Sequence, residues 1–244
     1  MAPTERIYLQ DTDRLRVEAT VVAMRDGAFA CDRSCFYPGG GGQPADEGTA
    51  RLPDGSKVQV ACAHADEDGV IWHVVKDTLP PELVGQQVEL AVATDRRHAL
   101  SRYHTVLHVL NTIALRDYGG WITGAQIATD YARIDFKLDR LSPELCRELE
   151  ARVNAVLQAG LAIRAYHLPA QEFARRGDLL RTLDARPPAV DGRVRVVEIV
   201  GFDAQACGGT HVHSTHEIGR FSIIRTENKG RINKRLYVKL DPTA

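Results

Sequence analysis

The first ninety residues alternate between apolar and polar positions in short runs, the pattern that half-buried β-strands produce. Segments rich in Gly, Pro and Asp, such as 25–27 and 80–81, separate these runs and predict tight turns. Regularly spaced short strands joined by tight turns indicate a small closed or nearly closed β-barrel. The predicted strands are residues 16–22, 28–31, 57–60, 70–75 and 87–92.

Beyond residue 95 the apolar positions take the spacing of helices and longer strands. Residues 98–117 have helical spacing and end before the glycines at 119 and 120, which stop a helix. A second helix is predicted with Ser142 as its N-cap and Pro143 as its first residue, running to Gly160. A short helical piece is expected at 172–183, and strands are expected at 131–138, 194–200, 219–227 and 235–240.

These elements predict two domains in an α+β fold. Residues 1–93 should form the N-terminal barrel, and residues 94–244 an α+β domain with helices packed on a mainly antiparallel sheet. Residues 1–95 contain 8 Lys and Arg against 16 Asp and Glu, a net charge of −8. The rest of the chain contains 23 against 16, a net charge of +7, so the second domain is the part expected to meet a polyanion.

Composition excludes several classes of protein. No apolar stretch is long enough to cross a bilayer, and residues 1–6 lack the basic start and apolar core of a signal peptide. The odd, scattered set of cysteines is no disulfide framework, and Cys31 and Cys35 fit as ordinary small strand residues. We therefore expect a soluble cytoplasmic protein that does not bind membranes; the sequence makes no prediction of its oligomeric state.

Two pairs of side chains have the spacing of metal ligands. His104 and His108 stand four residues apart on a predicted helix, so both rings lie on one face; alone, such a pair could be two partly exposed polar residues. Cys207 and His211 are also four apart, joined by two glycines, which permit backbone angles closed to other residues and suit a tight turn that brings both ligands to one ion. Together the pairs form a plausible tetrahedral zinc set, structural or catalytic. Thr105 stands where a zincin-type protease has glutamate, so that class is disfavoured.

Several motifs, taken in order, resemble the stand-alone alanyl-tRNA editing proteins (the AlaX family, medium-length type), which are related to the editing domain of alanyl-tRNA synthetase. The ordered set is stronger than any single motif. It comprises residues 36–48 (FYPGGGGQPADEG), 95–97 (DRR), the His104/His108 pair, 123–127 (TGAQI), Asp130 with 132–136 (ARIDF), 201–203 (GFD) and 207–212 (CGGTHV).

This resemblance implies a hydrolase that cleaves the ester between a wrong amino acid and alanine tRNA. Serine would be the chief substrate and glycine a second candidate. The implied Zn2+ ligands are His104, His108, Cys207 and His211. Thr123 would recognise the serine hydroxyl, with Gln126 in the same pocket. Gly39, Gly40, Gly41 and Gly42 match a glycine motif linked to substrate discrimination. No counterpart of the aminoacylation domain is present, so the chain should not charge tRNA.

A basic hairpin is predicted near the C-terminus. We expect Lys229, Arg231, Lys234 and Arg235 to contact RNA phosphates, although such lysines could instead protect a sheet edge. The glycine run at 39–42 lacks the Lys-Ser/Thr of a P-loop, and we expect it to allow close backbone approach between the barrel and the editing domain.

Three functions remain open from the sequence. The first is a zinc-dependent deacylase for mischarged alanine tRNA, in which His211 is expected to be a loosely held ligand so that substrate can enter. The second is a non-catalytic RNA-binding module with a structural zinc. The third is a zinc hydrolase of small aminoacyl esters that ignores RNA.

Overall fold

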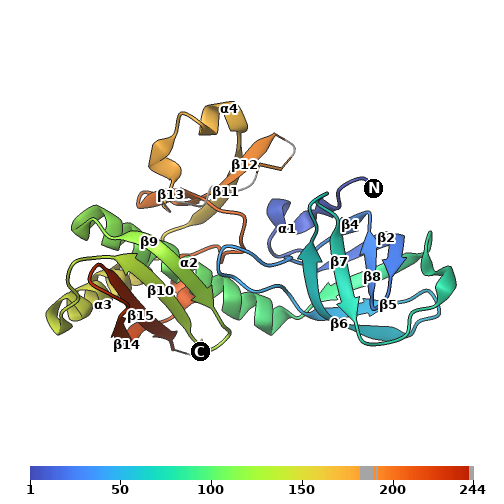
Figure 1. Ribbon diagram of the computed structural model, residues 1–244, viewed down its shortest axis with the longest axis horizontal. Helices are drawn as coiled ribbons and strands as arrows, with labels where there is room; N and C mark the ends of the chain where they lie inside the picture. Colours follow the sequence, from blue (N-terminus) through green and yellow to red (C-terminus); the bar gives the residue numbers. More distant parts are fainter. Residues whose placement is uncertain (182–188, 191, 242–244) are drawn as a thin grey trace. The chain divides into compact units, whose positions relative to one another are not determined.

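The computed structural model describes residues 1–181, 189–190 and 192–241 (Figure 1). The chain divides into two compact units, Met1–His98 and Ala99–Ala244. Helix α2 (Thr94–Tyr118) begins in the first unit and continues as the first helix of the second. The domain boundary expected between residues 93 and 94 therefore lies at the start of α2, five residues before the end of the first unit.

The first unit is built on a closed barrel of antiparallel strands in the order β2-β3-β7-β6-β5-β8 (Figure 1). The five predicted strands are present, and β5 is an addition that the sequence pattern did not predict. The barrel strands are β2 (Arg16–Arg25), β3 (Ala28–Cys31), β5 (Gly48–Arg51), β6 (Lys57–Ala65), β7 (Ile71–Val75) and β8 (Gln87–Val92).

Alternation along the strands fills the barrel with apolar side chains. On β2, Val17, Ala19 and Val21 are buried, and they pack in one core with residues such as Phe29 and Leu90. Short elements complete the unit: β1 (Glu5–Arg6) pairs in parallel with β4 (Arg33–Ser34), which α1 (Ile7–Gln10) contacts. The 3-10 turn η1 (Pro81–Leu83) lies between β7 and β8 in the chain.

The second unit contains two antiparallel sheets. One has the order β14-β15-β10-β9 and the other the order β11-β12-β13. The first sheet comprises β9 (Trp121–Ile127), β10 (Ala132–Lys137), β14 (Phe221–Asn228) and β15 (Asn233–Leu240). The second comprises β11 (Ile163–Pro169), β12 (Arg193–Ile199) and β13 (Asp203–Ala206).

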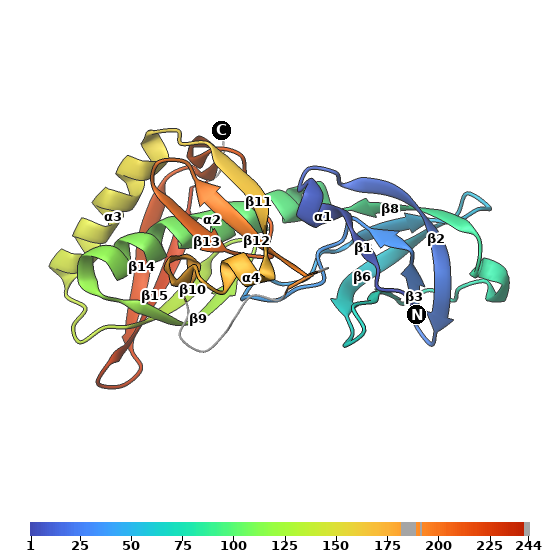
Figure 2. The ribbon, with the colours of Figure 1, turned by 90° about the horizontal axis from the view of Figure 1, so that it is seen from above.

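Helix α2 is the buried centre of this unit (Figure 2). Every residue from 100 to 114 is buried, which accords with a helix covered on all sides. The Tyr103 hydroxyl accepts a hydrogen bond from the Leu240 N–H of β15, at 3.2 Å. The Asn111 side chain donates to Gln205 on β13, at 2.7 Å. Helix α2 thus contacts both sheets and links them.

The other predicted helices are confirmed in part. Helix α3 (Pro143–Gln158) has Ser142 as its N-cap, whose hydroxyl accepts from the Leu145 N–H at 3.2 Å. The helical piece expected at 172–183 is wrong in extent. The chain there forms α4 (Ala170–Phe173) and the 3-10 turn η2 (Gly177–Leu179), and residues 182–183 lie outside the described residues.

The remaining regular element is η3 (Thr215–Ile218). A closed antiparallel barrel, two further antiparallel sheets and few helices confirm the predicted α+β class. None of the described helices combines the length and the apolar character that crossing a bilayer requires.

Candidate metal site

The structure brings the two predicted ligand pairs together in the second unit. One ligand atom from each of His104, His108, Cys207 and His211 lies within 4.8 Å of the others. Sγ of Cys207 is 3.4 Å from Nε2 of His104 and 3.4 Å from Nε2 of His211. The three imidazoles are buried, and their centroids are 4.4–5.1 Å apart. The four side chains therefore converge on one point.

Burial keeps the three imidazoles neutral. It lowers the pKa of His104 to about 4, with a further lowering by the charge of Arg195. Burial also lowers the pKa values of His108 and His211 well below 6.5, and neighbouring histidines add to the effect. Neutral rings keep the lone pair that a metal ion needs, so these are ligands rather than acids at neutral pH.

Cys207 experiences opposing effects. Burial raises the pKa of its thiol, whereas the positive charge of Arg195 and the Gly209 N–H both lower it. The Gly209 N–H donates to Sγ at 3.4 Å. Burial is the largest of these effects, so the pKa of the thiol lies above its ordinary value, and a metal ion would have to displace the proton to bind the thiolate.

Thr105 determines which nitrogen of His211 is available. Its hydroxyl donates its only hydrogen to the carbonyl of Ser101, at 2.7 Å. It therefore accepts from Nδ1 of His211 at 3.1 Å and from the Val212 N–H at 3.3 Å. Nδ1 carries the ring proton, and the lone pair sits on Nε2, the atom that faces Cys207.

The hydrogen bond from Nδ1 to the Thr105 hydroxyl thus anchors the ring of His211. The structure gives no support to the expectation that His211 is the loosely held ligand. In the sequence, Thr105 stands out only as the residue in place of a catalytic glutamate. Its role depends on a contact between residues 106 positions apart, which no local pattern reveals.

Two glycines lie in the turn between Cys207 and His211. Neither Gly208 nor Gly209 is among the glycines with positive φ, so the turn does not use the left-handed backbone angles that glycine permits. A Cβ at Gly208 would meet no atom within 4 Å. The turn is held instead by Arg195 of β12, whose Nη1 donates to the carbonyls of Cys207 and Gly209 at 3.0 and 2.8 Å.

A buried amide network joins α2 to β13 beside the site. Gln205 donates to the His108 carbonyl at 3.1 Å and to the Thr112 hydroxyl at 3.0 Å, and it accepts from Asn111. Because Gln205 lies two residues before Cys207, this network fixes the strand that leads into the second ligand pair against the helix that carries the first.

This donor set fits zinc. Two buried imidazoles on a helix, a third imidazole with its far nitrogen protonated, and one thiolate match the nitrogen and sulfur ligands that zinc prefers in tetrahedral sites.

The residues expected to read the substrate lie on β9. Thr123 is exposed, and its hydroxyl donates to Oδ1 of Asn233 on β15, at 2.9 Å. Gln126 is also exposed and accepts from Nε of Arg133, at 2.8 Å. Both contacts are made within the four-stranded sheet, and neither involves a member of the metal-ligand set.

Two of the four basic residues of the hairpin between β14 and β15 bond to groups within the protein. Lys234 is buried, and its Nζ donates to the carbonyls of Gly230 and Arg231 at 3.1 and 2.9 Å. Arg235 makes a bidentate pair with Asp135, with both N···O distances 2.7 Å. The two remaining residues, Lys229 and Arg231, are exposed. Nζ of Lys229 lies 3.1 Å from Oε2 of Glu227.

The glycine run lies in the first unit. Gly39, Gly40, Gly41 and Gly42 all have positive φ, at 86°, 128°, 56° and 87°, a sequence of angles that other residues rarely adopt. The Tyr37 hydroxyl donates to the Gly40 carbonyl at 2.9 Å.

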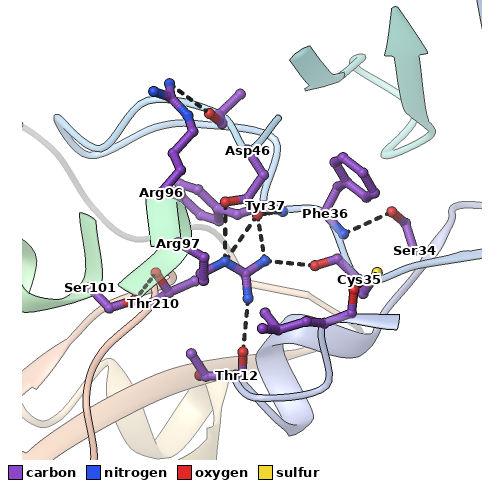
Figure 3. Close-up of polar contacts among 12 residues, drawn as sticks. Thr12, Ser34, Cys35, Phe36, Tyr37, Asp46, Arg96, Arg97, Ser101 and Thr210 are labelled. Atoms are coloured by element: carbon purple, nitrogen blue, oxygen red, sulfur yellow. Dashed lines mark hydrogen bonds and ion pairs between the residues drawn. The ribbon is translucent and has the colours of Figure 1, made fainter. Parts of the chain in front are cut away.

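A buried ion pair holds the segment that contains this run (Figure 3). Arg97, in the first turn of α2, is paired with Asp46 and also donates to the carbonyls of Thr12 and Cys35. Asp46 in turn accepts from the Tyr37 N–H at 2.6 Å. Arg97 and Asp46 both belong to motifs noted in the sequence, but only the structure shows that they pair.

Comparison with known proteins identifies the family. Residues 194–237 match the model of the threonyl and alanyl tRNA synthetase second additional domain. The chain is 32% identical to an alanyl-tRNA editing protein AlaX-M of Saccharolobus solfataricus, over 98% of this chain and all of the relative. It is 34% identical to a protein of the same name from Methanosarcina mazei, over 97% of this chain and 96% of the relative.

An alanine–tRNA ligase of Korarchaeum cryptofilum is also similar, with 39% identity over 91% of this chain but only 25% of the ligase. The match to stand-alone relatives is end to end, whereas the match to the ligase covers one portion of it. The resemblance noted in the sequence is confirmed, and the chain belongs to the family of alanyl-tRNA editing proteins of the AlaX-M type.

Proposed function

We propose that this protein hydrolyses the ester bond of alanine tRNA that carries a wrong amino acid, chiefly serine and as a second candidate glycine. The observation that carries the proposal is the convergence of His104, His108, Cys207 and His211 in a chain whose full-length relatives are named alanyl-tRNA editing proteins. An aminoacyl ester is already activated, so position and electrophilic help suffice for its hydrolysis.

Zinc is the ion that this ligand set would hold. When bound, it supplies a Lewis acid that can polarise the ester carbonyl or orient the amino group of the aminoacyl end. The chain's own contribution is to present neutral imidazoles and the Cys207 sulfur in fixed orientations. Thr105 does this for His211, and Gln205 for the strand before Cys207.

Covalent catalysis by a side chain is not supported. Cys207 is used as a ligand. Ser34 and His73 form a pair with Oγ and Nε2 2.8 Å apart, the arrangement of a nucleophile and its base, but both are 0% exposed inside the first unit. A substrate cannot reach them, so this pair is a structural one.

Selection of serine over alanine would depend on Thr123. Its hydroxyl already donates to Asn233, so toward a substrate it acts as an acceptor. A serine hydroxyl can donate to it, and an alanine side chain cannot. A site built to hydrogen-bond a hydroxyl rejects the analogue without one by about 10⁴-fold.

RNA contact would come from the exposed part of the basic hairpin. Lys229 and Arg231 are exposed, and we propose that they contact phosphates. Lys234 and Arg235 were expected to do the same, but their internal contacts suit them to holding the hairpin in shape.

A non-catalytic RNA-binding module is the second candidate, because a full set of four protein ligands is also what structural zinc sites have. Deacylation of purified seryl-tRNA(Ala) separates the two candidates. The wild type should hydrolyse it, His104→Ala should not, and His98→Ala, an exposed residue of the same helix, should behave as the wild type.

Replacing the alanine acceptor stem by an unrelated one tests the third possibility, a hydrolase of small aminoacyl esters. The proposal expects a large loss of rate. Equal rates on both RNAs would favour the small-ester hydrolase, and no hydrolysis of either by the wild type would favour the binding module.

A further inference from the structure

The segment that carries Cys207 leaves the sheet just before the metal site. Strand β13 ends at Ala206, and the last ladder contact to β12 is the Cys207 N–H donating to the Arg195 carbonyl, at 3.0 Å. From there the chain reaches His211 through a turn whose glycines at 208 and 209 have no positive φ. Neither the ladder nor a left-handed glycine conformation therefore determines the shape of this turn.

The side chain of Arg195 provides hydrogen bonds that hold the turn. One nitrogen, Nη1, donates to the carbonyls on both sides of Gly208, at 3.0 Å to Cys207 and 2.8 Å to Gly209. Arg195 is only 6% exposed, so little water competes for these carbonyls. The two carbonyls are thereby held together, and the peptide between them is fixed.

The fixed turn directs the sulfur. The Gly209 N–H donates to Sγ of Cys207 at 3.4 Å while the Gly209 carbonyl is held by Arg195, so Gly209 is restrained from both sides. In this arrangement Sγ faces Nε2 of His104 and of His211, each at 3.4 Å.

The imidazole ligands are held by other groups. Thr105 anchors the ring of His211, and the turn geometry of α2 sets His104 and His108 four residues apart. The side-chain hydrogen bonds that Arg195 makes to the turn reach the residues that present the sulfur, so its loss should disturb the position of Cys207 first.

We propose that Arg195 is a positioning residue of the metal site, which holds the turn from Cys207 to Gly209 in the shape that presents the thiolate to the three imidazoles. The inference rests on the metal ion of the proposed function and is independent of deacylation. Residues that orient metal ligands typically contribute about 10- to 100-fold to metal affinity, and we expect an effect of that size.

The test is zinc affinity, measured by competition with a chromophoric chelator in the absence of tRNA. Arg195→Met keeps an apolar stem without donors and should bind zinc about 10- to 100-fold more weakly. Arg195→Lys keeps the charge on a shorter stem that cannot hold both carbonyls, and it should lose about 10-fold. Arg193→Met is the matched control, since it makes the same change at an exposed arginine of the same strand, and its affinity should equal that of the wild type.

A second readout reports the thiolate itself. With cobalt(II) in place of zinc, the sulfur-to-cobalt charge-transfer band should weaken or shift in both Arg195 variants and stay unchanged in Arg193→Met. A simple loss of stability would lower the unfolding temperature of the metal-free protein and leave that band as it is in the folded fraction.

Wild-type zinc affinity and an unchanged cobalt spectrum in Arg195→Met would overturn the inference. If Arg195→Met does not fold, the same result in Arg195→Lys would overturn it. A wild type that binds no zinc would overturn both this inference and the metal in the proposed function. The expected zinc pattern together with no hydrolysis of seryl-tRNA(Ala) would overturn the proposed function alone.

Discussion

The hydroxyl of Thr105 lies 3.1 Å from Nδ1 of His211, so a residue that is not itself one of the four ligands joins the helix of the first ligand pair to the turn of the second. Its hydrogen is committed to the Ser101 carbonyl, which leaves the hydroxyl as an acceptor for the imidazole. The contact therefore sets both the position and the tautomer of a ligand.

Thr105→Val removes this acceptor at nearly constant volume. The ring of His211 would lose its orientation, and we expect zinc affinity to fall about 10-fold or more. Thr105→Ser keeps the hydroxyl and should retain most of the affinity. Chelator competition on the three proteins is the measurement, and equal affinity of Thr105→Val and wild type would contradict the role assigned to this contact.

Thr123→Val tests the proposed reader of serine. Because Thr123 is exposed and contacts Asn233 within the sheet, the substitution should leave metal content and fold unchanged. Hydrolysis of seryl-tRNA(Ala) should fall by about 10²-fold or more, since the serine hydroxyl loses its partner. Metal analysis and deacylation rates are measured on the same preparation. Loss of zinc along with activity would show that Thr123 is not a substrate reader.

His73 predicts a pH dependence of stability. Complete burial lowers its pKa from 6.5 to about 4. Because the unfolded state then binds more protons below pH 6.5, this contribution is fully present above pH 6.5 and is lost as the pH falls toward 4. The loss amounts to about 3 kcal/mol at most.

A double variant, His73→Phe with Ser34→Ala, removes the titrating ring together with its partner. Denaturant unfolding at pH 7 and pH 4.5 should show a smaller acid loss in this variant than in the wild type. The metal-site histidines contribute equally to both proteins, so parallel pH profiles would refute the assignment to His73.

Arg97 and Asp46 predict a large stability effect. Arg97→Met leaves the Asp46 carboxylate buried and unpaired, which should reduce the free energy of unfolding by about 3–5 kcal/mol. Adding Asp46→Asn removes that charge and keeps an acceptor for the Tyr37 N–H, so it should recover part of the loss. Urea unfolding of the wild type and both variants tests this, and an equal or greater loss in the double variant would contradict it.

Much of the fold could be predicted because alternation and caps are local. Strand β8 follows directly from the alternation of its side chains, and the N-cap of α3 follows from Ser142-Pro143. Strand β5 was missed because Gly48-Thr49-Ala50-Arg51 has little apolar alternation. Its place in the barrel depends on pairing with β6 and β8, which are distant in sequence.

In the candidate site too, local features could be predicted from the sequence and contacts between distant residues could not. The spacing of the four ligands is local within each pair and could be read from the sequence. The partners that orient them could not be, because Arg195 and Thr105 act across the fold. The same holds for Lys234 and Arg235: their charge is visible in the sequence, but whether it faces solvent or an internal partner such as Asp135 is not.

The most direct test of the central claim compares seryl-tRNA(Ala) and alanyl-tRNA(Ala) with one protein preparation in three states: as purified, after metal removal by a chelator, and after zinc is restored. We predict hydrolysis of the seryl ester up to about 10⁴-fold faster than that of the alanyl ester, its loss with the metal, and its return with zinc. Equal rates on the two esters, or full activity in protein shown to contain no metal, would contradict the proposed function.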